Sequence, residues 1–473
     1  MGQKASARLK YFANSKEVRR ISMSSQEKKQ VTRRDYLKTT AGAIAGLVVG
    51  GAVGYLATPT QVTTQTVTET QTVTVTGTAP PPTTPTAQPF KHGKSVMYLT
   101  PDIAETWWVA CKTYLQRAVE ADGWKFKFDT SDWSDSKCSD QLITYAQQYD
   151  CIFVFPTSLE GINPAIESAE KDYHCPVVAI KNFITGHARF TISFDDFGAG
   201  QTLVNMAIAD LQRRFGTTKG KTVVGFQGPY AASGWHMRAL GVIDAMKKHP
   251  EMKYVEVQAG TGDPAGWADA ADTYFATQTA DAVVSGSGGP YWYGTMNALS
   301  RYGKLYYVGD PKHIYSISID GKPSDLQWIR RGYVDDSLSQ SPDALMPLGW
   351  QLMRDYIVKD ASYQYPPYKI PDLPTPMTVT NPPNSYWPPD NNKMLIDKGL
   401  IYPETDMPQG VSPVYTVNKD NVNTKDIWGN TYTFWRGKEE IQMTTWPAKG
   451  TPPAWSQKLL DDYEAMFKQY YQW

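Results

Sequence analysis

The fold is decided by the stretch Val96-Met-Tyr-Leu-Thr-Pro-Asp-Ile-Ala-Glu-Thr-Trp-Trp108. Its first five residues, 96–100, have the apolar character of a buried strand, and the Pro-Asp pair that follows ends the strand. A helix is expected to start near Glu105, with Trp107 and Trp108 in its first turn. A strand that passes through a polar turn into a helix is half of a βαβ unit, and ligands of open α/β sheets bind at the carboxyl ends of the strands. We therefore expect at least one of the two tryptophans to stack on a small polar ligand.

Apolar runs and helical patterns alternate along most of the remaining chain. The expected strands lie near 95–100, 124–129, 151–155, 176–180, 220–227, 253–258, 280–285 and 304–309. The expected helices lie near 105–122, 137–149, 162–172, 234–248, 266–278, 292–301, 324–331, 343–358 and 455–470. Because the strands are apolar without a strong alternation and are joined by helices, they predict parallel sheets covered on both faces. The segment 220–227 opens like the segment 93–99, which predicts two βα lobes of similar size.

Composition excludes some partners and favours others. Lysine plus arginine and aspartate plus glutamate both number 47, so no net charge attracts nucleic acid or a membrane surface. Aromatic residues make up 12% of the chain, with 15 Trp and 29 Tyr. Flat aromatic faces with a polar edge suit carbohydrates and other ring ligands, although a rigid, aromatic-packed core would have the same composition.

The four cysteines, Cys111, Cys138, Cys151 and Cys175, lie close together in the sequence. They form no CxxC motif and no histidine pair has the spacing of metal ligands, so a zinc site is not expected. In an exported protein one or two disulfides can form in this region. Cys151 and Cys175 open two strands that should be neighbours, which favours that pair, and four buried thiols are the alternative.

The first part of the chain has the features of an export and tethering region. Thr32-Arg-Arg-Asp-Tyr-Leu-Lys38 resembles the twin-arginine export signal, and a weakly apolar segment rich in Gly and Ala, 41–57, follows it. That segment is near the lower length limit for crossing a bilayer, so an uncleaved anchor is the alternative to a cleaved signal. Residues 58–93, rich in Thr and Pro, predict an extended linker. We therefore expect an exported protein, in the periplasm or at the cell surface.

The order of the elements resembles that of the type I periplasmic sugar-binding proteins of ABC transporters, over residues 94–380. The resemblance rests on several local patterns in the right order and spacing. They are Trp107-Trp108, Cys151–Pro156, Ile162–Ala169, Cys175–Ile180, Asp195 with Gly198 and Gly200, Ser233–Gly241, Tyr307–Asp310, and Ile329–Val334 with Gln340. Two places depart from the family pattern. The fourth strand ends in Lys181-Asn182 rather than Asp-Arg, and the loop 285–290 lacks the usual Asn/Asp pair.

The resemblance implies an α/β fold of two Rossmann-like, doubly wound lobes with parallel sheets, joined by a hinge. It places the first lobe at residues 94–193 with 341–382 and the second lobe at 194–340. From about residue 383 the chain becomes rich in Pro and aromatic residues. We expect this irregular extension, 383–473, to pack on the first lobe.

Residue chemistry and the resemblance together predict the side chains that bind the ligand. A saturated ring needs aromatic faces for its C–H groups and planar polar partners for its hydroxyls. The expected ligand-binding residues are Trp107, Trp108, Asp132, Trp133, Asn182, Trp235, Arg238, Tyr291, Trp292, Asp310 and Gln340. Helical spacing assigns Trp108 mainly to the core and leaves Trp107 freer to stack. Arg238 could instead pair with Asp244, and Asp310 could be a turn residue.

These features predict an exported solute-binding protein that captures a small ligand, with a sugar as the expected class, for ABC permease subunits in the membrane. We expect a monomer with no nucleic-acid partner, no cofactor, no metal site and no catalytic residues. One alternative is a secreted glycan-active hydrolase, which needs two acidic residues about 5–10 Å apart across a pocket. The other alternative is a surface receptor that senses a nucleoside or another small polar ligand.

Overall fold

The computed structural model describes residues 92–103, 105–158, 160–182, 184, 188–260, 262–357, 377–378, 393–398, 408–412, 414–437 and 445–471. The predicted export signal, 1–57, and nearly all of the predicted linker lie outside the described residues. Within the part of the chain that is described, no helix has both the length and the apolar character needed to cross a membrane.

The first lobe is built on a sheet that contains the strand predicted at residues 96–100. Its strands are β1 (Ser95–Thr100), β2 (Lys125–Thr130), β3 (Cys151–Val154), β4 (Val177–Ile180), β5 (Phe190–Phe194), β11 (Met377–Thr378), β12 (Lys393–Lys398) and β13 (Pro408–Ser412). Their order is β11-β12-β13-β5-β4-β3-β1-β2, and β13, β5, β4, β3, β1 and β2 run parallel. The central strands are fully buried and the edge strand β2 is partly exposed, as expected for a parallel sheet covered on both faces.

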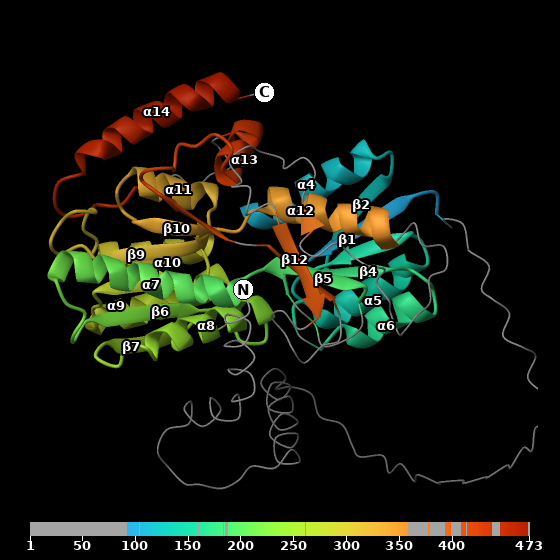
Figure 1. Ribbon diagram of the computed structural model, residues 1–473, viewed down its shortest axis with the longest axis horizontal. Helices are drawn as coiled ribbons and strands as arrows, with labels where there is room; N and C mark the ends of the chain where they lie inside the picture. The colour runs from blue at the N-terminus through green and yellow to red at the C-terminus, as the bar shows by residue number, and fades with distance from the viewer. Residues whose placement is uncertain are drawn as a thin grey trace, which may run out of the picture. The chain divides into compact units, whose positions relative to one another are not determined.

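Two pairs of helices cover the two faces of the first sheet (Figure 1). They are α4 (Thr106–Ala121) and α12 (Pro342–Leu352) on one face, and α5 (Asp135–Ala146) and α6 (Asn163–Lys171) on the other. Alternate residues of β1 point to the two layers: Val96 and Tyr98 pack with α4 and α12, whereas Met97 and Leu99 pack with α5 and α6. A short π-helical turn, η1 (Met353–Ile357), continues α12.

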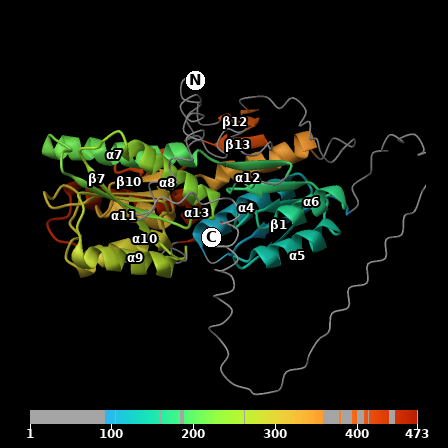
Figure 2. The same cartoon turned by 90° about the horizontal axis from the view of Figure 1, so that it is seen from below.

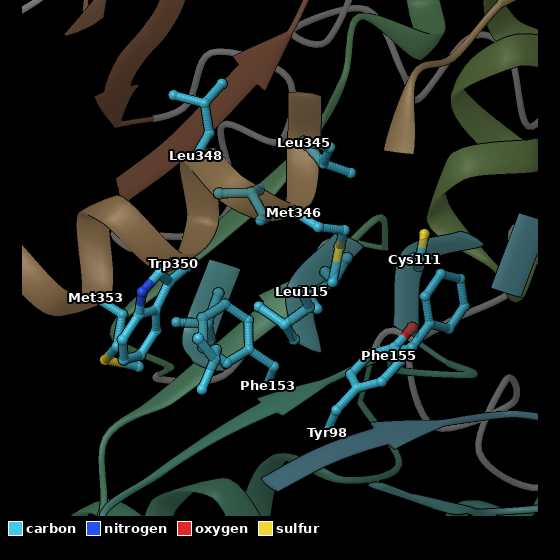
Figure 3. Packing of buried hydrophobic residues seen from close by; sticks show 14 of the residues in the cluster. Tyr98, Cys111, Leu115, Phe153, Phe155, Leu345, Met346, Leu348, Trp350 and Met353 are labelled. Atoms are coloured by element: carbon cyan, nitrogen blue, oxygen red, sulfur yellow. The ribbon is translucent and has the colours of Figure 1, made fainter. Parts of the chain in front are cut away.

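The core of the first lobe holds α4 in place. Side chains from β1, β3, α4 and α12 meet in one cluster, which Figure 3 shows around Tyr98, Leu115, Phe153 and Met346. Each is fully buried, and burial of one such side chain contributes about 1.5–3 kcal/mol. The first turn of α4, with its two tryptophans, is therefore fixed at the carboxyl end of the sheet.

The second lobe contains a six-stranded sheet. Its strands are β6 (Thr222–Gln227), β7 (Lys253–Gln258), β8 (Ala282–Ser285), β9 (Tyr315–Asp320), β10 (Asp336–Ser339) and β14 (Tyr415–Asn418), in the order β14-β10-β9-β8-β6-β7. All neighbours are parallel except β14, which pairs antiparallel with β10. Helices α7 (Asp196–Phe215) and α8 (Ser233–Met246) cover one face. Helices α9 (Pro264–Thr277), α10 (Pro290–Arg301) and α11 (Pro323–Arg330) cover the other (Figure 2).

The chain passes between the two sheets at three described places. It leaves β5 through Asp195 to enter α7, and it leaves β10 through Gln340 to enter α12. At the third place β13 ends at Ser412 in the first sheet, and β14 starts at Tyr415 in the second. The described part of the C-terminal extension thus joins both sheets, and its helices α13 (Trp428–Arg436) and α14 (Ala454–Tyr470) contact α11 of the second lobe.

One predicted strand is wrong. Residues 304–309 do not join the sheet; the strand that pairs with β8 is β9, eleven residues later. The run, of which only Leu305 is fully buried, contacts the C-terminal extension instead, where Lys449 donates its backbone N–H to Leu305 and accepts one from Tyr307. An apolar run of this length can be buried by either partner, and the sequence does not distinguish them.

A helix that the sequence analysis did not predict follows the first crossing. Helix α7 has 20 residues and is capped by Asp195, whose side chain accepts from the backbone N–H of Gly198. Its glycines make it a weak helix by propensity, but they allow close packing. A Cβ atom at Gly200 would collide with the backbone carbonyl of Arg238 in α8. The crossing of α7 and α8 therefore depends on a residue that lacks a side chain.

None of the four buried cysteines forms a disulfide, so the predicted disulfides are wrong and the alternative of four thiols is correct. Cys151 lies in β3, within the first-lobe core, and Cys175 lies on the other side of the sheet with Cys138. Neighbouring strand ends do not bring two sulfurs together when the side chains point to opposite faces of the sheet.

Candidate functional site

A pocket lies between the two lobes at the carboxyl ends of their strands. It encloses about 470 Å³ of space, part of which is open to solvent. The first lobe contributes Glu105, Trp107, Trp108, Trp133, Phe155, Lys181 and Asn182, and the second contributes Ala232, Gly234, Trp235, Arg238, Ser287, Tyr291, Asp320 and Lys322. Polar groups at the ends of parallel strands converge here, as expected for a ligand site in an α/β fold.

A buried network of charges centres on Asp196, in the first turn of α7. Its carboxylate accepts from the Arg238 Nε atom at 2.8 Å, the Lys181 Nζ atom at 3.1 Å and the Gln340 amide at 2.7 Å. The Gln340 side-chain oxygen accepts in turn from Arg238, at 2.7 Å, and from Lys181. One carboxylate, which is not itself in the lining, thus orients two cations of the pocket, one from each lobe.

A second group of charges connects the lobes directly. Lys322, at the start of α11, forms ion pairs with Asp320 at 3.1 Å and with Glu105, at the start of α4, at 2.9 Å. It also donates to the Gly288 carbonyl at 3.2 Å, and its Nζ atom lies 5.1 Å from the centre of the Tyr291 ring. All three N–H donors of Lys322 therefore have partners inside the protein.

Burial and charge pairing act in opposite directions on the pKa values of this site. Burial disfavours ionisation of Asp320, but Lys322, Arg238 and Lys181 outweigh it and lower the pKa of Asp320 to about 2. Burial also lowers the pKa of Lys181 to about 8, helped by the nearby Arg238 and opposed by Asp196. For Lys322 the neighbouring carboxylates outweigh burial and raise the pKa above its usual value. Asp320, Lys181 and Lys322 are thus ionised at neutral pH, whereas burial raises the pKa of Glu105.

Aromatic side chains form the walls above these charges. In the first lobe Trp108 meets Phe155 and Trp133 edge to face, with ring centres 4.3 Å and 5.9 Å apart. In the second lobe Trp235 meets Tyr291 in the same way at 6.0 Å. These rings line the pocket, and an aromatic face can stack on the C–H face of a ring ligand.

The backbone at the pocket is strained at four positions. Lys181 has φ of 68° and Asp320 has φ of 94°, and both lie directly at the end of a strand. Asp132 and Trp133, after β2, have φ of 51° and 58°. Non-glycine residues rarely adopt these angles, and such strain tends to collect at functional sites. Among the described residues only Lys94 and His174 share this property elsewhere.

The structure brings together most of the residues that the sequence predicted. Seven line the pocket, namely Trp107, Trp108, Trp133, Asn182, Trp235, Arg238 and Tyr291. Gln340 lies behind them in the Asp196 network. Arg238 does not pair with Asp244, which contacts Lys248 and Gln201 instead.

Both tryptophans of α4 belong to the core and also line the pocket. Helical spacing therefore did not distinguish a core tryptophan from one that faces the ligand. The Trp107 Nε1 atom donates to the Gln340 carbonyl at 3.0 Å. The Trp108 Nε1 atom is buried and has no partner within the described residues. Trp108, unlike Trp107, therefore has a buried N–H group without a hydrogen-bond partner among the described residues.

Besides Gln340, three predicted residues lie outside the lining of the pocket. Asp132 is exposed and pairs with Lys137 at 2.6 Å. Trp292 is fully buried in the core of the second lobe. Asp310 lies in a turn, where its carboxylate accepts from the Lys312 backbone. The position expected for Asp310, at the end of the strand after β8, is occupied by Asp320.

Four charged residues of the pocket were not predicted as ligand candidates, namely Glu105, Lys181, Asp320 and Lys322. Glu105 and Lys322 precede helices, and Lys181 and Asp320 end strands, so each occupies the same kind of place as the residues that were chosen. Within the described residues no group of histidines, cysteines and carboxylates is arranged to hold a metal ion.

Comparison with known proteins identifies the fold. Residues 96–361, more than half of the chain, match the family described as a periplasmic binding protein domain. The chain belongs to the periplasmic binding protein family. This assignment and the two parallel α/β sheets confirm the predicted family and fold class.

Solved structures resemble this periplasmic binding protein in fold. A galactofuranose-binding protein matches with a TM-score of 0.54 and 16% identity, over 69% of this chain and 95% of the other. The myo-inositol-binding protein of Caulobacter matches with a TM-score of 0.54 and 15% identity, over 71% and 96%. An ABC transporter solute-binding protein of Bacillus halodurans, with bound myo-inositol, matches with a TM-score of 0.52 and 13% identity, over 72% and 99%. No curated protein matches the sequence.

Proposed function

We propose that this protein is an extracytoplasmic solute-binding protein that captures a small polyhydroxylated solute, of the sugar or polyol class, for an ABC importer. The observation that carries the proposal is the pocket between the lobes, which is lined both by aromatic side chains and by buried hydrogen-bonding side chains. A ring with hydroxyl groups needs both features at once.

The polar groups of the pocket suit hydroxyls. Asp320 and Glu105 supply carboxylate oxygens that accept from a hydroxyl, and Arg238 has N–H groups beyond those used by Asp196, Gln340 and Gly286. Hydrogen bonds to charged groups each contribute about 1.5–3 kcal/mol, so a few of them give strong binding to an uncharged ligand.

The pairing of charges favours an uncharged solute. Lys322 is neutralised by Glu105 and Asp320, and Asp196 lies between Lys181 and Arg238. A charged ligand would enter a buried site whose cations already have partners, and it would leave the displaced partner unpaired.

The proposal is tested by measuring the thermal unfolding midpoint of the full chain with and without candidate ligands. Monosaccharides and polyols, with myo-inositol among them, are compared with a nucleoside and an amino acid. A ligand at 100 times its Kd stabilises the folded state by about 2.7 kcal/mol, which raises the midpoint measurably. We expect a rise with at least one sugar or polyol.

Two matched variants locate the binding site. Asp320→Asn removes a charge from the pocket and should weaken the Kd about tenfold or more, since one charge-assisted hydrogen bond is lost. Asp310→Asn makes the same chemical change outside the pocket lining and should leave the Kd unchanged. A rise with the nucleoside alone would contradict the sugar or polyol class, and turnover of a glycoside would favour the hydrolase.

A further inference from the structure

Helix α13, in the C-terminal extension, contacts the second lobe beside the pocket. Its residue Gly429 lies so close to the loop after β9 that a Cβ atom there would be 2.7 Å from the Gly321 carbonyl. Asn430, one residue later, accepts from the buried guanidinium of Arg330 in α11 at 2.5 Å. These contacts attach one side of α13 to the start and the end of α11.

The same helix contacts the first lobe. Thr431 shares a hydrogen bond of 3.2 Å with the hydroxyl of Tyr114 in α4. Tyr432 and Trp428 belong to the first-lobe core cluster, together with residues of α4 and α12. Figures 1 and 2, seen from directions 90° apart, both place α13 between α11 and α4. The helix is therefore part of both lobes, and the family match ends at residue 361, well before it.

Trp428 links this helix to a residue of the pocket. Its ring is fully buried in the first-lobe cluster, and its Nε1 atom donates to the backbone carbonyl of Asp320 at 2.8 Å. The same carbonyl accepts from the backbone N–H of Gln340 at 3.1 Å. Asp320 is the residue with φ of 94°, so its backbone needs such contacts to keep a conformation that it would otherwise rarely adopt.

We propose that α13 is an interlobe clasp and that Trp428 is a positioning residue, which holds Asp320 in the orientation that faces the ligand. The inference rests on the proposed function only in its consequence for ligand affinity. Asp320 pairs with Lys322, and Lys322 pairs with Glu105 at the start of α4. A shift of the Asp320 backbone is therefore passed across the pocket to the first lobe through these ion pairs.

Hydrogen exchange of the full chain without any added ligand tests the clasp. Trp428→Phe keeps an aromatic ring in the cluster and removes the N–H donor. We expect the amides of Gly321 and Lys322 to exchange about fivefold faster than in the unmodified protein. The amides of Trp108 and Val109, in the first turn of α4, should also exchange faster.

Trp446→Phe is the matched control. Trp446 lies in the same extension, is also buried, and donates its Nε1–H to Asn297 at 2.6 Å, away from the pocket. This variant should lower the melting temperature as much as Trp428→Phe does, without faster exchange at Gly321, Lys322, Trp108 or Val109. Faster exchange confined to α13 in Trp428→Phe, or the same exchange pattern in both variants, would overturn the clasp.

Calorimetric titration with myo-inositol and D-galactose measures the consequence for affinity. If either probe binds the unmodified protein, Trp428→Phe should weaken the Kd about fivefold and Trp446→Phe should not. An unchanged Kd in Trp428→Phe would overturn its role as a positioning residue. If neither probe binds the unmodified protein, the proposed function loses support, while the exchange measurement still decides whether α13 is a clasp.

Discussion

The side-chain oxygen of Asn182, at the end of β4 in the first lobe, accepts a hydrogen bond of 3.1 Å from the backbone N–H of Gly234, in the first turn of α8 in the second lobe. The residue before α8, Ala232, has no side chain that can cap the helix. Asn182 thus supplies across the pocket the capping group that Ala232 cannot supply, while its own amide nitrogen donates to the Pro156 carbonyl at 2.7 Å. The first turn of α8 is complete only when the two lobes are together.

Replacing Asn182 with alanine should lower the free energy of unfolding by about 1 kcal/mol, because a helix loses its capping group. It should also increase the radius of gyration measured by X-ray scattering, since a contact between the lobes is lost. The control is Asp263→Ala, which removes the cap of α9 inside the second lobe, where the side chain accepts from Gly266 at 2.7 Å. A radius of gyration that changes equally in both variants would contradict an interlobe role for Asn182.

The ion pairs of Lys322 should be strongly coupled. Lys322→Met leaves two buried carboxylates, Glu105 and Asp320, without their cation, and should lower the free energy of unfolding by about 3–5 kcal/mol in urea titrations. Adding Glu105→Gln should recover part of this loss, because one of the unpaired charges is removed. Additive effects of the two substitutions would show that the pair does not interact across the pocket.

Lys181 should make stability depend on pH in the alkaline range. Its pKa of about 8 in the folded protein is below the value of about 10.4 for an unfolded lysine. Between these two pH values the unfolded state binds more protons, so the free energy of unfolding should rise as the pH increases from about 8 to about 10. Lys181→Met should remove this rise, whereas Lys137→Met, at an exposed ion pair, should preserve it. The rise would be assigned to another group if Lys181→Met retained it.

The four cysteines should be protected until the protein unfolds. All are buried, and burial raises the pKa of Cys138 to about 12, so little thiolate is present at neutral pH. A thiol reagent should react with none of them in the folded protein and with all four in guanidinium chloride, without a reducing agent. Detection of two thiols after unfolding would point to a disulfide in the purified protein.

Sequence patterns correctly predicted the elements whose apolar residues can be buried in only one way. The buried strands β1, β3 and β4 have no polar face, so a position inside a covered parallel sheet follows from the pattern alone. The run 304–309 had two possible partners, and its burial by the C-terminal extension cannot be read from its own residues. That error moved the expected carboxylate from Asp320 to Asp310.

The charged part of the pocket was less predictable for a different reason. Lys181 and Asp320 point into the pocket because their backbones are left-handed, and no residue pattern predicts that conformation for a lysine or an aspartate. Lys322 and Glu105 are ordinary helix-start residues when each is considered alone. Their role depends on a contact between segments more than two hundred residues apart.

The pairing of β13 with β5 has a consequence for how this protein is made. Thr191 is opposite Gln409 in that pair. Strand β5 therefore obtains its partner β13 only after most of the chain has left the ribosome. Until then the edge of β5 is open, and an unpaired strand edge can pair with another chain. Such distant pairing also slows folding. Nascent chains that stop before residue 408 should therefore depend on chaperones and aggregate more readily than the complete protein.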